Sequence, residues 1–321
     1  MALKIGGGAI HKFLVRLKNH IAEKKIDYLF VDEISMVQEI FYSWFILIKR
    51  IKPDIKFIFS GDYAQLAPIK DRVKYCDYED SQALYELVDG NIQKLTNCRR
   101  ANKLFFSLTD PDNIKNLKKE HFYNQPQLRN IVFTNEKRKE INKECMDKFI
   151  IHQAYNLARK AHKFKKGMTD KELSPYINKQ KAIELKALQY DGNSQDVKLV
   201  EGTPIIAHKT VRNIKKISQK EDDDLSQLLE TSSVFNNEEF EITSIDPKNQ
   251  IIKAKNARTE LEIPFNQFQQ IFYVAFALTV HKSQGQTYNF NFAIHQWEQY
   301  DDRMKYVALT RATSKKLINI I

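Results

Sequence analysis

The sequence predicts an α/β protein with parallel sheets and a β-rich insertion, and three observations favour this fold class. Short apolar segments of strand length alternate with longer segments of helical periodicity, as in parallel sheets covered by helices. Polar residues follow the strand-like segments directly, at the edge where such sheets bind ligands. A later stretch of period-two alternation and turn residues is typical of antiparallel strands.

The first α/β series predicts a partial parallel-sheet domain over residues 1–125. Its helical segments have apolar residues at a spacing of three to four, and its strand-like segments are short and apolar throughout. The predicted elements are, in order, a helix over 9–25, a strand over 27–31, a helix over 37–51 and a strand over 56–60.

A second α/β series predicts a second parallel-sheet domain, built from residues 126–151 and 266–321. The two parts have the same alternation of strand-like and helical segments, so we expect them to complete one sheet. The predicted elements are a strand over 130–134, a helix over 136–150, a strand over 290–294, a helix over 306–312 and a strand over 316–321.

Two segments of different character separate these parts. Residues 152–202 are Lys-rich and hydrophilic, which is typical of an exposed insertion, although an ordinary solvated surface has the same composition. Residues 203–265 have the alternation of β-strands, and Asp246-Pro247-Lys248-Asn249 is a credible hairpin turn. The acidic run 221–224 is expected to be a loop.

Composition bounds the class of protein and its partners. The 321 residues carry a formal net charge of +11, which favours a polyanionic partner such as nucleic acid. Apolar runs such as 45–48 are far below the about 18 residues of a membrane span, so no membrane partner is expected. Three scattered cysteines suit neither a zinc site nor a disulfide frame. We therefore expect a cytoplasmic or nuclear protein, and the abundance of Lys, Ile and Asn is typical of an AT-rich genome such as that of a large DNA virus or its host.

Two carboxylates end the first predicted strand, in the segment VDEISM (31–36). Asp32 and Glu33 suit a division of labour in which one carboxylate holds Mg²⁺ and the other polarises the water that attacks the γ-phosphate of ATP. A strand that ends in two acids is also common in proteins without this chemistry. The second predicted strand is followed by GDYAQLAPI (61–69), where the amide of Gln65 can sense a γ-phosphate and donate to the attacking water.

Further segments carry groups suited to phosphate or nucleic acid. They are LTNCRR (95–100), IVFTN (131–135), TVHKSQGQT (279–287) and YVALTRA (306–312). Each is a weak signal alone. Taken together and in this order, all the segments resemble the motifs of the PIF-type and RecD-like DNA helicases of superfamily 1B. VDEISM resembles their Walker B motif, and the last two segments resemble their most specific motifs.

The resemblance spans almost the whole chain and implies a fold. It implies two RecA-like motor domains, with residues 203–265 as an SH3-like insertion in the second. The segment VFNNEEFEITSI resembles the NGxxG-type strand segment of that insertion, with Asn237 and Glu238 where glycines are usual.

The resemblance also implies ATP and Mg²⁺ as cofactors and gives roles to matching residues. Asp32 is the Mg²⁺ ligand, Glu33 the catalytic base and Gln65 the γ-phosphate sensor. Arg100 aligns with one arginine finger, with Arg99 as the alternative one residue away, and Arg311 aligns with the second finger. Residues of the nucleotide cleft are Gln284 and Gly285, and those of the DNA track are Thr134, Asn135, Thr279, His281 and Lys282.

Simpler roles remain open for several of these residues. Thr134 and Asn135 stand where a strand gives way to a helix, so they suit a phosphate, but N-capping needs the same residues. A lone histidine such as His281 is more often a hydrogen-bonded core residue than a ligand contact. Tyr63, Phe265 and Tyr273 are of a type that stacks on bases, yet most aromatic residues belong to the core.

The sequence contains no P-loop of the form G-x-x-x-x-G-K-[ST], which cradles the phosphates in this family. Gly6-Gly7-Gly8 lacks the Lys and the hydroxyl residue, and Ile5, Gly7, Ile10 and His11 fit instead the IxGxTIH pattern found downstream of the P-loop. We therefore expect the first motor domain to be truncated, the P-loop segment to be supplied in cis or in trans, and the chain alone to hydrolyse ATP negligibly.

The expected function is that of an ATP-dependent DNA helicase acting on single-stranded DNA and duplex junctions, with 5′-to-3′ movement implied by the resemblance. The alternative is a non-catalytic nucleic-acid-binding protein derived from a helicase. It is favoured by the absent P-loop and the charge of +11, and opposed by the retained acids and arginines. A P-loop GTPase is disfavoured, because TVHKSQGQT and YVALTRA have no role in one.

Overall fold

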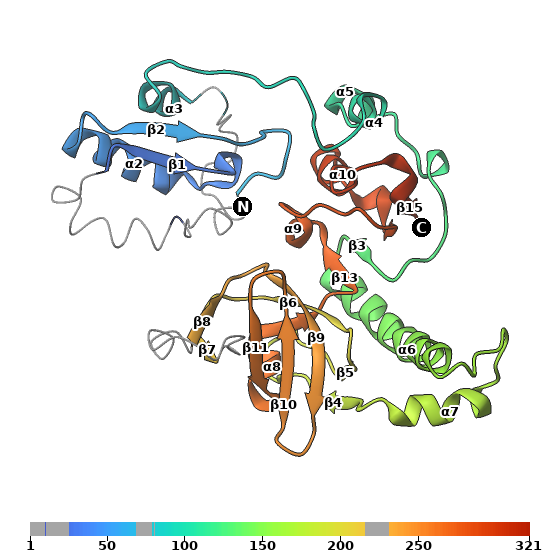
Figure 1. Cartoon of the computed structure of the whole chain (residues 1–321). Helices are drawn as coiled ribbons and strands as arrows, with labels where there is room; N and C mark the ends of the chain where they lie inside the picture. Colours follow the sequence, from blue (N-terminus) through green and yellow to red (C-terminus); the bar gives the residue numbers. More distant parts are fainter. Residues whose placement is uncertain (1–9, 11–25, 69–78, 80, 216–230) are drawn as a thin grey trace. The chain divides into compact units, whose positions relative to one another are not determined.

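The computed structural model describes residues 10, 26–68, 79, 81–215 and 231–321 (Figure 1). Three predicted features lie outside the described residues: most of the helix over 9–25, the Gly6-Gly7-Gly8 segment and the acidic run 221–224. The chain divides into two compact units, each of which is described by itself. Unit 1 comprises residues 1–121, 284–289 and 300–315, and unit 2 comprises residues 122–283, 290–299 and 316–321.

A parallel pair of strands and the helix between them form the centre of unit 1. Strand β1 (Tyr28–Val31) pairs with β2 (Lys56–Phe59) in the register Val31↔Phe59. Helix α2 (Glu39–Ile51) packs on the pair, and Phe45 at its centre lies fully buried against Phe57. The two strands and the helix predicted here are therefore confirmed, with the helix beginning two residues later.

The other helices of unit 1 begin at side-chain caps. Ser81, Asn102 and Asp110 each accept a hydrogen bond from a backbone N–H of the following turn, as N-caps do. Further elements of this unit are α3 (Gln82–Leu87), α4 (Lys103–Leu108), α5 (Pro111–Ile114) and the 3₁₀ turns Ile34–Met36 and Lys119–His121.

Helix α10 (Asp302–Leu309) also belongs to unit 1 and differs from the helix predicted over 306–312. Asp301 caps its N-terminus by accepting from the N–H of Met304, so the helix begins earlier than the apolar spacing indicates. It ends before Arg311. That arginine therefore lies just beyond the helix C-terminus, not within a helical turn.

Unit 2 contains a parallel sheet with the strand order β13-β3-β14-β15. Every residue of its strands over 130–132 and 292–294 is buried, as expected of strands that helices cover on both faces. The predicted strand over 316–321 is shorter in the structure, because residues 315–317 form a 3₁₀ turn. The strands are β3 (Asn130–Val132), β13 (Ala277–Thr279), β14 (Phe292–Ile294) and β15 (Ile318–Ile320), and the short helices beside them are α9 (Val280–Ser283) and the 3₁₀ turn Trp297–Gln299.

A helical hairpin occupies the first part of the Lys-rich stretch. Helix α6 (Asn135–Lys160) extends ten residues beyond the predicted end, and α7 (Asp170–Lys179) returns along it (Figure 1). Ala154 and Ala158 of α6 are fully buried against Leu173 of α7. Small side chains allow this close approach, so part of the stretch predicted to be an exposed insertion has a core of its own.

An antiparallel sheet with the order β11-β10-β9-β6-β12 forms the β-rich part of unit 2. The predicted hairpin turn joins β9 to β10, and the sheet continues to β12 beyond residue 265. The strands are β6 (Pro204–Ala207), β9 (Glu239–Asp246), β10 (Ile251–Lys255), β11 (Glu260–Pro264) and β12 (Phe272–Val274), with helix α8 (Phe265–Ile271) before the last. Two further strand pairs are β4 (Ile183–Leu185) with β5 (Val197–Leu199), and β7 (Val211–Lys215) with β8 (Thr231–Val234).

The described residues include no helix that is long and apolar enough to cross a membrane.

The domain boundaries proposed from the sequence stay a prediction.

The segments that follow β1 and β2 touch each other in unit 1. The N–H of Ile34 donates to the carbonyl of Ser60 over 2.9 Å, and the N–H of Ser60 donates to the carbonyl of Val31 over 2.9 Å. A Cβ added to Gly61 would lie 2.8 Å from Cγ2 and 2.9 Å from the backbone nitrogen of Ile34. Only glycine allows this approach.

We therefore expect Gly61→Ala to lower the free energy of unfolding by about 1–3 kcal/mol, because the backbone of Ile34 must move to admit the methyl group. Urea denaturation measures the change. Gly192→Ala is the matched control, since nothing lies within 4 Å of a Cβ placed there. Equal effects of the two substitutions would contradict the packing argument.

Candidate nucleotide site and nucleic-acid track

The two oxygens of the Asp32 carboxylate differ in their surroundings. Its Oδ1 accepts a hydrogen bond of 2.6 Å from the hydroxyl of Ser60, which follows the neighbouring strand. Its Oδ2 is buried and has no hydrogen-bond partner among the described residues. Buried carboxylate oxygens without a donor are costly, so this atom suits a cation or a water held by one.

Glu33 occupies a strained position beside Asp32. Its backbone is left-handed, with φ 55° and ψ 45°, which is uncommon for a residue other than glycine. Burial raises the pKa of the Glu33 carboxyl, the negative charges of Asp32 and Asp62 raise it further, and Arg311 opposes them. The raised pKa brings this carboxyl closer to the range in which a general base works.

The carboxylate of Asp62 accepts hydrogen bonds from three donors, which come from two regions of unit 1. Its Oδ1 accepts from the N–H of Ala64 over 3.0 Å, and its Oδ2 accepts from Nε2 of Gln65 over 3.2 Å and from the hydroxyl of Tyr306 over 2.6 Å. Burial and the bond to Asp62 raise the pKa of the Tyr306 phenol, which therefore stays protonated and donating. The bond to Asp62 orients the amide of Gln65, whose buried Oε1 has no partner among the described residues.

Arg311 is the most deeply buried charged residue of this region, with 1% of its surface exposed. Its guanidinium donates to the carbonyls of Val307 and Gln286 over 2.8 and 3.0 Å and to the hydroxyl of Thr310 over 3.0 Å. Burial and the neighbouring charge of Arg100 lower the pKa of Arg311 to about 10, and Glu33 acts in the opposite direction. Arg311 and Glu33 thus interact through space.

Arg100 joins the same region from the exposed side. Its guanidinium donates to the carbonyl of Thr310 over 3.1 Å, next to Arg311. Two like charges placed together repel each other unless an anion lies near both. The predicted arginine pair therefore has the electrostatics of an anion site.

Gln284 and Gly285 belong to unit 1 as well. Both polar atoms of the buried Gln284 side chain lack a partner among the described residues, as does Nε2 of Gln286. Gly285 has φ +81°, and a Cβ added there would meet nothing within 4 Å. The unsatisfied buried atoms of Asp32, Gln65, Gln284 and Gln286 thus include both donors and acceptors. A phosphate with its metal ion offers partners to both kinds, so these residues fit a nucleotide and Mg²⁺.

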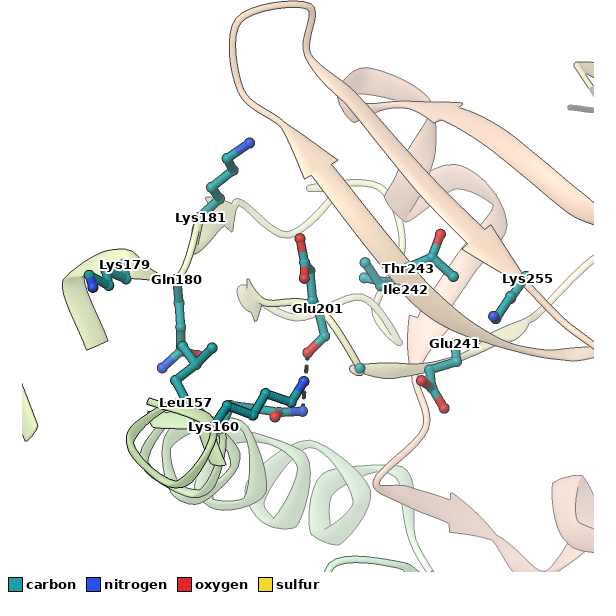
Figure 2. Close-up of a pocket in the computed structure, with 12 residues that line it drawn as sticks. Leu157, Lys160, Lys179, Gln180, Lys181, Glu201, Glu241, Ile242, Thr243 and Lys255 are labelled. Carbon is teal, nitrogen blue, oxygen red and sulfur yellow. Dashed lines mark hydrogen bonds between the residues drawn. The ribbon is translucent and has the colours of Figure 1, made fainter. Parts of the chain in front are cut away.

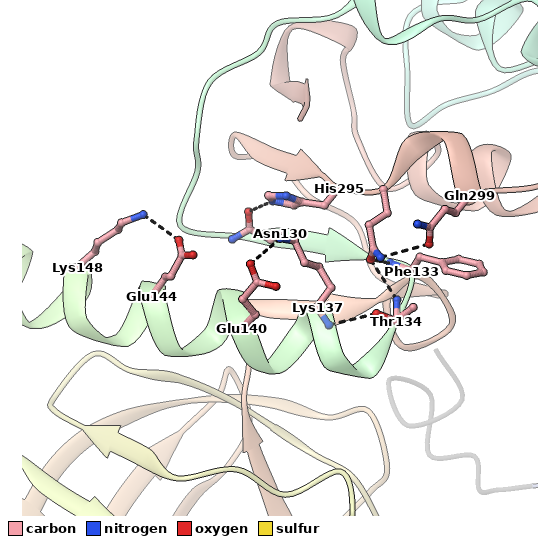
Figure 3. A network of polar contacts seen from close by, with 10 residues as sticks. Asn130, Phe133, Thr134, Lys137, Glu140, Glu144, Lys148, His295 and Gln299 are labelled. Atoms are coloured by element: carbon pink, nitrogen blue, oxygen red, sulfur yellow. Dashed lines mark hydrogen bonds and ion pairs between the residues drawn. The ribbon is translucent and has the colours of Figure 1, made fainter.

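The predicted DNA residues lie in unit 2. Thr134 is the N-cap of α6, where its hydroxyl accepts from the N–H of Lys137 over 3.1 Å. Its own N–H and that of Phe133 donate to Oε1 of Gln296 over 3.3 and 3.2 Å (Figure 3). The capping role left open by the sequence is therefore present, and Asn135 is exposed and accepts from Nε of Arg138.

The other three predicted DNA residues lie close together in sequence, where strand β13 gives way to helix α9. Thr279 ends β13 and is 9% exposed, whereas His281 and Lys282 lie half-buried on α9. The ammonium of Lys282 donates to the side-chain oxygens of Asn236 and Asn237 over 2.7 and 2.8 Å. Burial lowers the pKa of Lys282, and the charge of Arg138 lowers it further.

Sequence reasoning missed several residues of these sites. Ser60, Asp62 and Tyr306 orient the predicted residues, and the last two lie inside the quoted motifs, so their place in those motifs was the available signal. Gln296 and Arg138 stand in segments that carried no motif. Within the part of the chain that the structure describes, no group of three or more His, Cys, Asp or Glu side chains could hold a metal ion by itself.

Glu33 gives this region a pH-dependent stability. Its pKa in the folded chain lies above the ordinary value of 4.5, so the ionised carboxyl costs stability at pH 7. We expect Glu33→Gln to raise the free energy of unfolding at pH 7, and the gain to vanish as the pH falls below about 4.5. Urea denaturation at pH 7 and pH 4, with the exposed Glu298→Gln as control, measures this. A gain that persists at pH 4 would argue against a raised pKa.

Comparison with known proteins gives one family match over part of the chain and a set of similar solved structures. Residues 274–318 match the family model of the UvrD-like helicase C-terminal domain. The search of curated protein sequences found no match.

Solved structures of Pif1 helicases resemble the chain along nearly its whole length. One of these structures concerns DNA unwinding at forked dsDNA by two coordinating Pif1 helicases. It has a TM-score of 0.61 at 16% identity, covering 99% of this chain and 78% of that chain. Bacteroides Pif1 bound to ssDNA has a TM-score of 0.60 at 15% identity, covering 98% and 79%. Bacteroides Pif1 with ADP-AlF3 and ssDNA has a TM-score of 0.55 at 16% identity, covering 99% and 80%. The chain therefore has the RecA-like fold seen in the Pif1 helicases, and residues 274–318 are similar to the UvrD-like helicase C-terminal domain.

Proposed function

We propose that the chain is the motor part of an ATP-dependent DNA helicase that translocates on single-stranded DNA and unwinds duplex junctions. The observation that carries the proposal is that the opposite charges of Glu33 and Arg311 shift each other's pKa within unit 1, which also holds buried polar atoms without partners among the described residues. An acid that can activate water and an arginine that can stabilise a phosphoryl group are the two parts that ATP hydrolysis needs.

The proposed roles follow from these surroundings. Mg²⁺, when bound, neutralises charge on the phosphates, and the open Oδ2 of Asp32 is its proposed ligand. Glu33 accepts the proton of the attacking water, and Gln65, oriented by Asp62, senses the γ-phosphate. Arg100 and Arg311 act as arginine fingers, and Gln284 and Gly285 contact the nucleotide.

DNA is proposed to contact Thr134, Asn135, Thr279, His281 and Lys282. Two findings support a DNA partner: the net charge of +11, and the likeness in fold to Pif1 structures that hold ssDNA or forked DNA. Nucleotide use is supported by the likeness to the complex with ADP-AlF3. The proposed 5′-to-3′ direction comes from the motif resemblance alone.

The test combines DNA binding with ATP hydrolysis. We expect the 321-residue chain to bind single-stranded DNA with an affinity that falls with salt, because phosphates are contacted. We expect it to hydrolyse ATP negligibly alone, and a form joined to an upstream P-loop segment to be stimulated by single-stranded DNA. Glu33→Gln should then lower turnover by about 10²–10⁴-fold without loss of DNA binding. DNA binding without hydrolysis in the extended form would favour the non-catalytic alternative.

The arginine assignment has a built-in control, because Arg99 and Arg100 are adjacent and both exposed. In the extended form, we expect Arg100→Ala to lower ATP turnover by about 10³-fold or more, since an arginine finger stabilises charge on the transferring phosphoryl group. Arg99→Ala should have less than about a tenth of that effect. The reverse order would transfer the role to Arg99.

A further inference from the structure

A pocket of about 430 Å³ opens in unit 2 beside Lys282, whereas the residues proposed to bind ATP belong to unit 1. Its lining includes Tyr190, Asp191, His208, Lys209, Tyr273 and Lys282. Lys282 belongs to a motif with a predicted role, and Tyr273 is one of the aromatic residues that the sequence left open between the core and a base. Apart from Lys282, these residues come from the loop after β4, the end of β6 and the strand β12.

One wall of the pocket is built from stacked side chains. The rings of Tyr273 and His208 are parallel within 6°, with centroids 4.1 Å apart. The guanidinium of Arg138 lies 4.9 Å from the centroid of the same tyrosine, and the phenol donates to Oδ2 of Asp191 over 2.6 Å. Tyr273 is therefore held by a stacked ring, a cation and a hydrogen bond, which fix the shape of this wall of the pocket.

Positive charge at the pocket exceeds negative charge. Lys209 and Lys282 line it, and Arg138, only 3% exposed, stands behind Tyr273. Asp191 is the carboxylate among the described lining residues, and its oxygens already accept from Tyr273 and from the N–H of Asn193. The acceptors that hold the ammonium of Lys282 are neutral amide oxygens.

Nearby charges also shift the pKa values of two lining residues, Lys282 and His208. The charge of Arg138 adds to burial in lowering the pKa of Lys282. Burial lowers the pKa of His208; the hydrogen bond to the carbonyl of Gln269 and the charge of Asp191 oppose this, and the charges of Lys209 and Lys282 add to the lowering, so the ring is neutral near pH 7. A bound anion would relieve the repulsion among these cations.

An exposed aromatic ring stands at the rim. Tyr190 is 79% exposed, in a loop that is tied back by hydrogen bonds from the N–H of Ala187 to Asp196 over 2.9 Å and from the N–H of Leu188 to the hydroxyl of Ser194 over 3.0 Å. The Tyr190 ring is exposed to solvent, and its loop is already held by hydrogen bonds. Stacking of a planar group on the ring therefore costs little conformational entropy. Such rings beside cations are typical of single-strand binding.

A second basic pocket lacks this combination. A cavity of about 450 Å³ between α6, α7 and the β-rich sheet is lined by Lys160, Lys179, Lys181 and Lys255 (Figure 2). Glu201 and Glu241 share its lining, and none of the described residues that line it is aromatic. Its lysines fit a solvated charged surface, and they supply a control.

We propose that the pocket beside Lys282 binds one nucleotide of a single-stranded nucleic acid, with the phosphate at Lys209 and Lys282 and the base stacked on Tyr190. The inference rests on the proposed function, because it extends the DNA track of the motor. It adds residues outside every motif that the sequence offered.

The experiment measures binding of the full chain to labelled strands by fluorescence anisotropy over a range of salt. The probes are oligothymidylate and an abasic deoxyribose-phosphate strand of the same length. We expect Tyr190→Ala to weaken binding of oligothymidylate about 5- to 20-fold and binding of the abasic strand less than about twofold, because only the former has bases to stack. Tyr190→Phe keeps the ring and should bind both strands as the unaltered chain does.

The phosphate contact has its own signature. Lys209→Gln should weaken binding of both strands and reduce the slope of log affinity against log salt by about 0.7, the change expected for one lost phosphate contact on a single strand. Lys160→Gln removes a charge of the same kind from the other basic pocket. It should change the slope by less than half of the change expected for Lys209→Gln. Circular dichroism of each variant checks that it is folded.

The outcomes separate the two proposals. Unchanged affinity in Tyr190→Ala and Lys209→Gln, with strong binding by the unaltered chain, overturns the pocket and leaves the helicase proposal standing. Equal losses on the two strands overturn the stacking role. If thymidine monophosphate binds as tightly as the strand and loses binding in both variants, the site takes free nucleotides, and the strand assignment is wrong. Absence of any strand binding by the unaltered chain overturns both proposals.

Discussion

The hydrogen bond between Asp62 and Tyr306 is the interaction on which the candidate nucleotide site depends. Asp62 follows strand β2, whereas Tyr306 lies on α10, 244 residues later in the chain. This bond of 2.6 Å links the segment that carries Gln65 to the helix that precedes Arg311. Because the phenol is partly buried and its pKa is raised, the donor is retained at all ordinary pH values.

The same region stores unfavourable electrostatics that a ligand would relieve. Glu33 has two carboxylate neighbours and a left-handed backbone, and Arg311 is buried beside a second arginine. Several buried polar atoms of unit 1 also lack hydrogen-bond partners among the described residues. Proteins seldom keep such costs in one place without a function, and a triphosphate with its metal ion would compensate the positive and the unsatisfied groups together.

Unit 2 holds several cations by neutral acceptors, an arrangement that suits the nucleic-acid track proposed for it. Lys282 is held by amide oxygens, and Arg138 is held by Asn135, a backbone carbonyl and the face of Tyr273. Neutral acceptors fix the position of a charge while leaving its field intact. At the start of α6, the network around Thr134 fixes the helix N-terminus in the same manner, through Gln296 (Figure 3).

The sequence by itself determined the local elements and the chemistry of the motifs. Apolar periodicity located β1, α2, β2 and the β9–β10 hairpin, because burial on one or two faces leaves a regular pattern in a short segment. The order of motifs indicated the helicase fold that the comparisons also indicate. The caps of α10 and the long extension of α6 were missed, since one depends on a single side-chain oxygen and the other on Ala–Leu packing against α7.

Only the tertiary structure decided which of these residues meet. Nothing local in Glu33 or Arg311 specifies their interaction, since each acquires its shifted pKa from burial and from charges distant in sequence. The same holds for Tyr273, whose ring the sequence leaves ambiguous between the core and a base. Its neighbours His208 and Arg138 come from other elements, so their stacking exists only in the folded chain.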